Sequence, residues 1–387
     1  MKILHTSDWH LGHTLYNYDR REEQITMLQQ MVNIVKNEKP DAFLLCGDVY
    51  HTAQPSAEIQ TLLTEALVSI HDAHPQMVMV VTAGNHDSAT KHEIFRTPWK
   101  ALKVHTVGML EKENPEAHII EVPGKGFVIA VPYANERNIP EGYFQQLLEA
   151  VAERNTDNLP VVMMAHTTVK GCDFTGHDRG TEYAVGGIDS LDIGQLGEGY
   201  DYLALGHIHH EQFVHTGKHN ARYSGTPIPI SFDENYAHFV SMVEISKHGE
   251  KPEVKKIEIE NPRPLVTLPT TGTATWEEAK ELLKNFPDDI PAYIRLNVEI
   301  EDFLPVEASQ EAVALTEGKS CRFCHINAKR KAVEKTETKA LTVQEFQSEE
   351  PIDIARRYAD DMGETFDDEM KELFNETLNL LNADLRD

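Results

Sequence analysis

Five short stretches rich in Asp, Asn and His each follow an apolar run, and their side chains suit metal-assisted chemistry. The stretches are Asp8-Trp9-His10, Gly47-Asp48, Gly84-Asn85-His86-Asp87, His166 and Gly206-His207-Ile208-His209. A lone histidine among the 20 in the chain is more often an ordinary surface or core residue than a ligand. Five such stretches in order favour a shared metal site instead. The candidate ligands are Asp8, His10, Asp48, Asn85, His166, His207 and His209.

These ligands are too many for one ion and fit two ions that share a carboxylate. Asp8 and His10 are two residues apart, as are His207 and His209, so in extended backbone the members of each pair point the same way. Asp48 stands alone between these pairs, and we expect it to bridge the ions. Mixed oxygen and nitrogen ligands suit manganese, iron or magnesium. We predict two Mn²⁺ ions, with Mg²⁺ as an alternative.

Two further histidines are predicted to act on a phosphate. Paired metal ions clamp a phosphate, lower the pKa of a bridging water and stabilise both oxygens of an in-line displacement. His86 directly follows the candidate ligand Asn85, and we expect it to protonate the leaving oxygen. His51, shortly after Asp48, is expected to stabilise charge developing on the same phosphate. Asp87 either orients His86 or caps the turn, and the sequence leaves both open.

The elements between these stretches predict an α/β fold with a mostly parallel sheet. An apolar stripe over residues 21–39 indicates a helix, and Ser56 is a predicted N-cap for a second helix. These helices alternate with the apolar runs before Asp8, Asp48 and Asn85 in βαβαβ order. Because the carboxyl ends of parallel strands meet at one edge of a sheet, the ligands should converge there.

The chain changes character near residue 261. The stretch Asn261-Pro262-Arg263-Pro264 marks a predicted boundary, and residues 262–340 resemble a small α+β domain that contains a capping box at Thr275. Residues 341–387 are acidic and predicted helical, with large apolar residues on one face. We expect them to dock into a partner's groove, with packing on the chain's own body as the alternative.

Composition limits the function classes. A net charge of −27 argues against binding nucleic acid by bulk electrostatics, although bound metal ions or a partner would supply local positive charge. The chain has no apolar run long enough to span a bilayer, and we expect a cytoplasmic protein. Cys321 and Cys324 are half of a zinc pattern at most, so a structural or incidental role is expected.

Five basic residues near the predicted site loops are candidates for phosphate contacts, with a solvated surface as the more ordinary account of each. They are Arg20, Arg21, Lys91, Lys170 and Arg179.

The five stretches resemble the motifs of calcineurin-like metallophosphoesterases over residues 1 to about 245. A narrower resemblance is to the bacterial SbcD family, the nuclease subunits of SbcC–SbcD complexes. It rests on His10-Leu11-Gly12, Asp48-Val49-Tyr50-His51, residues 207–212 and the stretch from Tyr223 to Glu234. The resemblance implies a metallophosphoesterase sandwich at residues 1–261, a capping domain at 262–340 and a helical ATPase-partner-binding segment at 341–387.

The same resemblance implies roles for the site residues. One ion would be held by Asp8, His10, Asp48 and His209, and the other by Asp48, Asn85, His166 and His207. It further implies Mn-dependent 3′→5′ exonuclease activity on duplex DNA and endonuclease activity on single strands and hairpins, in DNA recombination, repair and replication. The implied partners are an SbcC ATPase and a second nuclease subunit within a heterotetramer near the nucleoid.

Two alternatives to a nuclease remain open. A phosphomonoesterase or nucleotidase of the same fold would act on a small substrate, since fold does not fix substrate. A scaffold with vestigial catalysis is the other. The appended domain and apolar tail count against the first, and the intact ligand set counts against the second.

Overall fold

The computed structural model describes residues 1–175, 190–214, 220–331, 351–362, 366–367, 370–375 and 377–378. The chain forms two compact units. One contains Met1–Val298 and Leu304–Ala328, and the other contains Glu299–Phe303 and Lys329–Asp387. The predicted boundaries at residues 261 and 340 stay a prediction.

A six-stranded sheet with the order β16-β15-β1-β4-β5-β6 carries three of the predicted strand ends. Strands β1, β4, β5 and β6 run parallel, and β15 and β16 are antiparallel to their neighbours, so the predicted parallel βαβαβ opening is confirmed. The strands are β1 (Lys2–Thr6), β4 (Ala42–Cys46), β5 (Val78–Thr82), β6 (Val104–Val107), β15 (Phe239–Glu244) and β16 (Glu253–Glu258).

A second six-stranded sheet, with the order β13-β14-β12-β9-β8-β7, carries the other two strand ends. Its central strands β8, β9, β12 and β14 are parallel. The strands are β7 (Ile119–Val122), β8 (Gly126–Ala130), β9 (Val161–His166), β12 (Tyr202–Gly206), β13 (Gln212–Phe213) and β14 (Ala221–Tyr223). Two short pairs accompany the sheets: β2 (Thr14–Leu15) with β3 (Tyr18–Asp19), and β10 (Thr168–Val169) with β11 (Ser190–Leu191).

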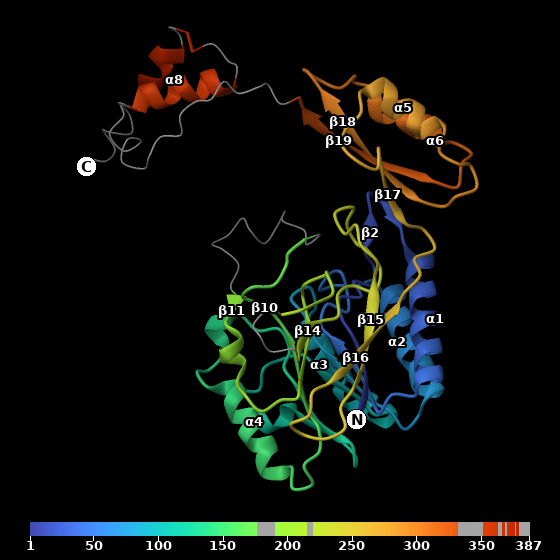
Figure 1. Cartoon of the computed structure of the whole chain (residues 1–387), viewed down its shortest axis with the longest axis vertical. Coiled ribbons are helices and arrows are strands. Elements are labelled where there is room, and N and C mark those ends of the chain that lie inside the picture. Colours follow the sequence, from blue (N-terminus) through green and yellow to red (C-terminus); the bar gives the residue numbers. More distant parts are fainter. Residues whose placement is uncertain are drawn as a thin grey trace. The chain divides into compact units, whose positions relative to one another are not determined.

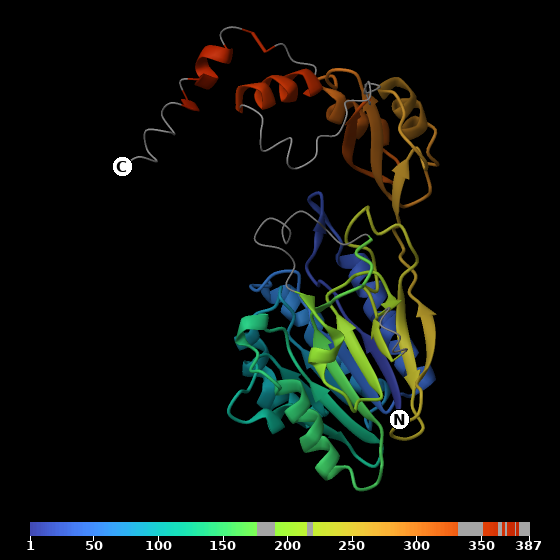
Figure 2. The same ribbon diagram turned by 60° about the vertical axis from the view of Figure 1, so that its left-hand side comes forward.

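The two sheets face each other, with helices on their outer sides (Figures 1 and 2). Leu44 of β4 and Met164 of β9 lie in one buried cluster between the sheets. Their neighbours point outward, since alternate residues of a strand face opposite ways: Leu45 packs with the helices α1 and α2, and Met163 packs with α4. Both faces of the central strands are therefore buried, as in other parallel sheets covered by helices. The helices are α1 (Arg21–Glu38), α2 (Ala57–Ala73), α3 (Ala89–Trp99) and α4 (Tyr143–Arg154).

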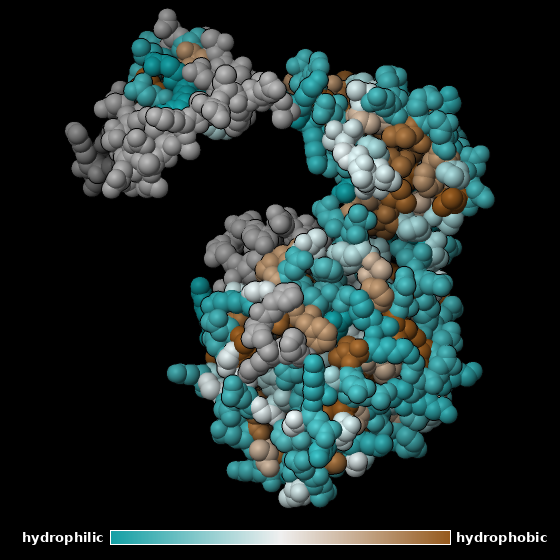
Figure 3. Space-filling view, viewed as in Figure 1, coloured by the Kyte–Doolittle hydropathy of each residue, from teal (hydrophilic) through white to brown (hydrophobic). Residues whose placement is uncertain are grey.

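A three-stranded sheet follows the sandwich in sequence, with the order β17-β18-β19. The elements are β17 (Leu265–Leu268), α5 (Trp276–Lys284), β18 (Tyr293–Ile300), α6 (Ala308–Thr316) and β19 (Arg322–Arg330). Thr275 and Glu278 form the predicted capping box at the start of α5. Hydrophobic surface gathers around α5 and α6, where Leu282 and Val313 are exposed (Figure 3).

The second unit contains the helix α8 (Pro351–Met362). Residues 370–375 and 377–378 are also helical, which agrees with the predicted helical tail. The rings of Phe366 and Phe374 meet edge to face at 6.4 Å. Residues 341–350, 363–365, 368–369, 376 and 379–387 of the predicted segment lie outside the described residues. Among the described helices, none combines the length and apolarity needed to cross a membrane.

Candidate dinuclear metal centre

The ends of five strands from both sheets meet and bring the seven predicted ligands together. Asp8, His10 and His209 form one group whose potential ligand atoms lie within 4.8 Å of one another. A second group with the same spacing consists of Asp48, His166 and His207. All six residues are buried.

Asp48 and Asn85 link the parts of the site. Asp48 Oδ2 lies 3.4 Å from His166 Nε2 and 3.8 Å from His10 Nε2, so this carboxylate reaches both groups. Asn85 Oδ1 lies 2.9 Å from His166 Nε2 and 3.1 Å from His207 Nδ1. Asn85 therefore joins the second group, and Asp48 has the position expected of a shared ligand.

The backbone at four of the predicted ligands adopts positive φ angles that non-glycine residues rarely adopt. The angles are 53° at Asp8, 43° at His10, 47° at Asp48 and 97° at His207. Such outliers are costly and cluster at functional sites, where the surrounding fold holds them. The backbone of Gly47 lies very close to the His166 ring, because a Cβ at position 47 would lie 2.2 Å from His166 Nδ1.

Burial and charge set the protonation states in the metal-free site. Burial opposes ionisation of Asp48, but the imidazoles of His166 and His10 hold the pKa of this carboxyl well below its usual range. Burial also opposes the charged form of His166, but Asp48 and Asp8 outweigh it and raise the pKa of His166 to about 9. A metal ion ligated by His166 must therefore displace a proton at neutral pH.

Three of the predicted ligands are oriented by neighbours that the sequence did not reveal. His166 Nδ1 lies 2.8 Å from the Cys46 carbonyl oxygen, and His209 Nδ1 lies 3.2 Å from Glu234 Oε1. When Nδ1 donates in each case, Nε2 is left to bind a metal. Asp8 accepts hydrogen bonds from Ser7 Oγ at 2.5 Å and from the His207 backbone N–H.

The donor atoms fit a pair of divalent ions. His10 Nε2 and His209 Nε2 face each other across 3.3 Å in a buried space, where lone pairs of two such nitrogens suit one cation. Two adjacent groups of oxygen and imidazole donors with a carboxylate between them match a two-metal site.

The sequence model described as calcineurin-like phosphoesterase matches residues 1–211, more than half of the chain. The SbcD subunit of the SbcCD nuclease from Rhodobacter capsulatus is 31% identical over 306 residues, covering 72% of this chain and 74% of that protein. The Bacillus subtilis protein of the same name is 30% identical, covering 79% and 81%. The Escherichia coli K12 protein is 26% identical and covers 98% of both chains. The chain belongs to the SbcD family of calcineurin-like phosphoesterases.

In this SbcD-family chain, the two predicted catalytic histidines lie beside the ligands. Potential ligand atoms of His10, His51 and His86 lie within 4.8 Å of one another. His86 Nδ1 lies 3.0 Å from the His51 carbonyl oxygen, and the rings of His51 and His86 are stacked at 5.8 Å. With Nδ1 donating to this carbonyl, Nε2 of His86 is the atom left for proton transfer.

Asp87 fixes the turns that present the ligands. Its carboxylate accepts hydrogen bonds from the backbone N–H groups of Val49, Tyr50 and Gly84 at 2.8–3.1 Å. These groups belong to the turns after β4 and β5. Of the two roles left open by the sequence, the structure favours turn capping, because both oxygens of this carboxylate are engaged by backbone N–H groups.

The four basic candidates within the described residues have different surroundings. Arg20 is fully buried and donates to the Pro229 carbonyl oxygen at 2.5 Å, so neither a phosphate contact nor a solvated surface describes it. Arg21 and Lys170 pair with Glu58 and Asp192 at the surface. Lys91 lies on α3, and Arg179 lies outside the described residues.

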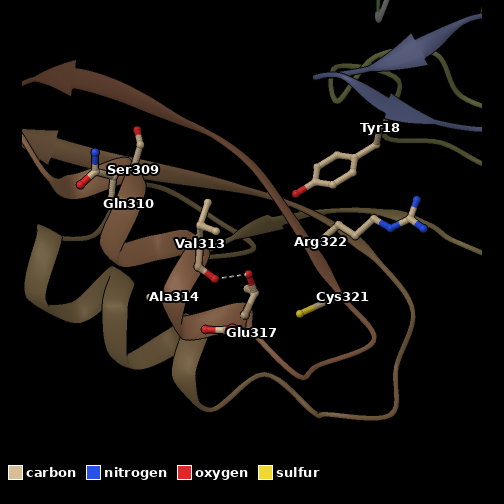
Figure 4. A pocket seen from close by; sticks show the side chains of 9 residues that line it. Tyr18, Ser309, Gln310, Val313, Ala314, Glu317, Cys321 and Arg322 are labelled. Carbon is tan, nitrogen blue, oxygen red and sulfur yellow. Dashed lines mark hydrogen bonds between the residues drawn. The ribbon is translucent and has the colours of Figure 1, made fainter.

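A separate hollow of about 640 Å³, lined by none of these histidines, lies beside α6 (Figure 4). Val313 of α6, Tyr18 of β3 and Arg322 of β19 line it. Cys321, one of the two cysteines considered for zinc, also lines this hollow, and burial raises the pKa of its thiol. Both Cys321 and Cys324 are free thiols, and no zinc-type cluster includes them among the described residues.

Proposed function

We propose that this chain is the nuclease subunit of an SbcC–SbcD-type complex and hydrolyses phosphodiesters in DNA. The observation that carries the proposal is the pair of adjacent donor groups that Asp48 reaches together. Relatives named as nuclease subunits support the substrate class. The proposed activities are 3′→5′ exonuclease action on duplex DNA and endonuclease action on single strands and hairpins.

We assign the seven ligands to two ions, Mn²⁺ with Mg²⁺ as an alternative. Asp8, His10, Asp48 and His209 would hold one ion, and Asp48, Asn85, His166 and His207 would hold the other. When bound, the ions would clamp the phosphate, activate a water and stabilise the charge of the in-line displacement. Mixed oxygen and nitrogen donors suit manganese better than zinc, whose structural sites are rich in thiolates.

Two histidines of the chain would act on the phosphate itself. His86, anchored through Nδ1 to the His51 carbonyl, would deliver a proton from Nε2 to the leaving oxygen. His51, stacked on His86, would donate a hydrogen bond to a phosphate oxygen as charge develops on it. Asp87 would keep the turns that carry these residues in register through its three backbone contacts.

The tail is proposed to bind an SbcC-like ATPase. Tyr358 and Leu373, both exposed, offer apolar contacts for a groove on that partner. The proposed assembly contains two nuclease subunits within a heterotetramer and processes DNA ends and hairpins in recombination, repair and replication. A cytoplasmic, nucleoid-associated location follows from that role.

One assay tests the proposed activity. Purified chain with Mn²⁺ is given linear duplex DNA, hairpin DNA and a chromogenic phosphate monoester. Cleavage of either DNA supports the proposal, and chelation of the metal should abolish it. Hydrolysis of the monoester with no cleavage of DNA would replace the proposal with a phosphomonoesterase, and no hydrolysis by metal-loaded protein would indicate a scaffold.

A further inference from the structure

Tyr133 stands at the rim of the metal centre. Its backbone N–H donates to the carbonyl oxygen of Ala83 at 2.8 Å, directly before the Gly84-Asn85 turn. Its ring centroid lies 6.2 Å from that of His166, with the planes at 80°. Both the backbone and the ring of Tyr133 are therefore held against residues of the site.

Tyr133 is also partly exposed to solvent. The residue is 41% exposed, whereas the ligands it borders are buried. Single exposed apolar residues are common on proteins and carry no meaning by themselves. Tyr133 differs because a defined ring contact and a backbone hydrogen bond fix an exposed aromatic side chain beside a predicted ligand.

The charge of the chain makes an uncharged contact valuable for a polyanionic substrate. With a net charge of −27, the protein as a whole repels DNA, whereas bound metal ions would attract its backbone locally. Stacking of a base on an aromatic ring does not depend on that charge, and every base offers a π face. In a nucleotide, one sugar separates the base from its phosphate. When the phosphate is held in the site, an aromatic ring at the rim can therefore contact the base of the same nucleotide.

We infer that Tyr133 is a stacking platform for a nucleobase next to the scissile phosphate. The inference rests on the proposed DNA substrate and deepens it: the site takes a nucleotide whose base is unstacked from its own strand. Single strands, hairpin loops and frayed ends offer such a base at the lowest cost. Tyr133 is then a binding residue that favours these substrates over an intact duplex interior.

A protein-by-substrate cycle tests this inference. Single-stranded oligonucleotides carry one abasic residue at successive positions, and kcat/KM for cleavage at each phosphate is compared with that of the intact strand. For the unmodified protein, we expect a loss of about 5- to 150-fold when the missing base neighbours the cleaved phosphate, as for a lost base–aromatic stack. Tyr133→Leu, which keeps bulk but has no π face, should lose the same factor on intact strands and be insensitive to the abasic residue. Tyr133→Phe should behave like the unmodified protein.

Two further measurements separate stacking from other effects. Bound metal is measured for each variant, because a loss of metal in Tyr133→Leu would mean that the ring only supports His166 and would overturn the inference. Binding of intact and abasic strands without turnover is measured by anisotropy titration of His86→Ala protein, with Tyr133 and with Leu at position 133. The affinity should depend on Tyr133 and on the neighbouring base in the same way as kcat/KM.

Tyr16→Ala is the matched control. Tyr16 is exposed to a similar extent, 46%, but its ring already stacks on His325 at 4.3 Å. The variant Tyr16→Ala should lose kcat/KM on abasic strands by the same factor as the unmodified protein. If Tyr16→Ala were instead as insensitive to the abasic residue as Tyr133→Leu, the assignment to Tyr133 would be overturned. Cleavage of DNA with no coupling between Tyr133 and the base would refute stacking alone, whereas no cleavage of any DNA would refute the proposed function.

Discussion

Glu234 Oε1 lies 3.2 Å from His209 Nδ1, and through this contact a residue outside the predicted ligand set would control metal binding. The other carboxylate oxygen of Glu234 accepts a hydrogen bond from Thr226 Oγ1 at 3.0 Å, so the carboxylate is itself held in place. Partners of this kind fix the tautomer and the direction of a ligating imidazole.

We therefore expect Glu234→Gln to weaken metal binding by about 10- to 100-fold, because the amide is a poorer acceptor for the imidazole N–H. Titration of the metal-free protein followed by calorimetry measures the affinity. Asp233→Asn is the matched control: the neighbouring carboxylate pairs at the surface with Arg295 and should leave the affinity unchanged. Equal affinities for Glu234→Gln and the unmodified chain would remove Glu234 from the site.

His86 is the residue for which metal binding and catalysis should separate. His86→Ala should retain both ions and lose about 10²- to 10⁴-fold in kcat, as expected for a missing general acid. Elemental analysis and cleavage rates are measured on the same sample. A collapse of metal content would show that His86 is a ligand or a support for one.

Metal uptake should release protons. Although burial opposes it, the pKa of His166 is raised to about 9 by Asp48 and Asp8, above its ordinary value of 6.5. In the metal-free protein, the protonated His166 thus stabilises the fold fully below pH 6.5, and this contribution disappears as the pH rises through about 9. Metal binds the neutral ring, so affinity should increase with pH over that window.

Calorimetry at about pH 7.5, between the ordinary and the raised pKa of His166, in two buffers of different ionisation enthalpy measures the proton release. His166→Asn, which carries no titrating ring, should release fewer protons. Cleavage should accordingly weaken at mildly acidic pH. An affinity that does not change between pH 6.5 and about 9 would contradict the assigned protonation of His166.

The convergence of the candidate ligands was predictable from the sequence, and their supporting contacts were not. Asp8, Asp48 and Asn85 each follow a recognisable strand, and parallel strands must end at a common edge. The Cys46 carbonyl that orients His166 leaves no side-chain signal, since any residue offers a carbonyl. Glu234 is an ordinary acid in sequence, and its contact with His209 depends on how the 223–234 segment folds back.

At the scale of elements, local rules predicted the helix starts well. Ser56 accepts a hydrogen bond from the Ile59 N–H at 3.3 Å and begins α2, as its sequence position indicated. Packing between residues far apart in the chain was harder to predict from the sequence. Tyr293 alternates along β18 with the apolar residues Ile294 and Leu296 and so lies on the opposite face, yet it is fully buried, with the guanidinium of Arg20 5.7 Å from its ring. This arrangement arises only when the β2–β3 hairpin meets β18.

The cap of α2 gives a stability prediction at this scale. Ser56→Ala should lower the free energy of unfolding by about 1 kcal/mol, because the Ile59 N–H loses its acceptor. Ser69→Ala is the control, since Ser69 is exposed within the same helix and donates only to the Glu65 carbonyl, which the helix itself already uses. Urea denaturation of the two variants side by side should separate them, and an equal effect of both would show that the cap contributes nothing.

At the scale of the whole molecule, the chain combines an acidic phosphoesterase body with a tail that carries exposed apolar side chains. Tyr358 of α8 is 67% exposed and Leu373 is 65% exposed. Met370 of the same tail is 48% exposed as well, so the tail carries a group of such side chains rather than a single one. Grouped apolar side chains left in water are typical of a binding surface, because their burial against a partner would be favourable. The proposed SbcC-like ATPase supplies the groove that would cover them.

Replacing both residues with alanine should therefore abolish capture of the ATPase while leaving metal content and the cleavage of DNA by the isolated chain unchanged. Co-purification of tagged chain with its ATPase, followed by elemental analysis, measures both properties. Glu372→Ala, an exposed polar change beside Leu373, is the control and should retain the partner. Undiminished capture by the double variant would place the partner surface elsewhere on the chain, whereas loss of metal would show that the tail supports the phosphoesterase body rather than a partner.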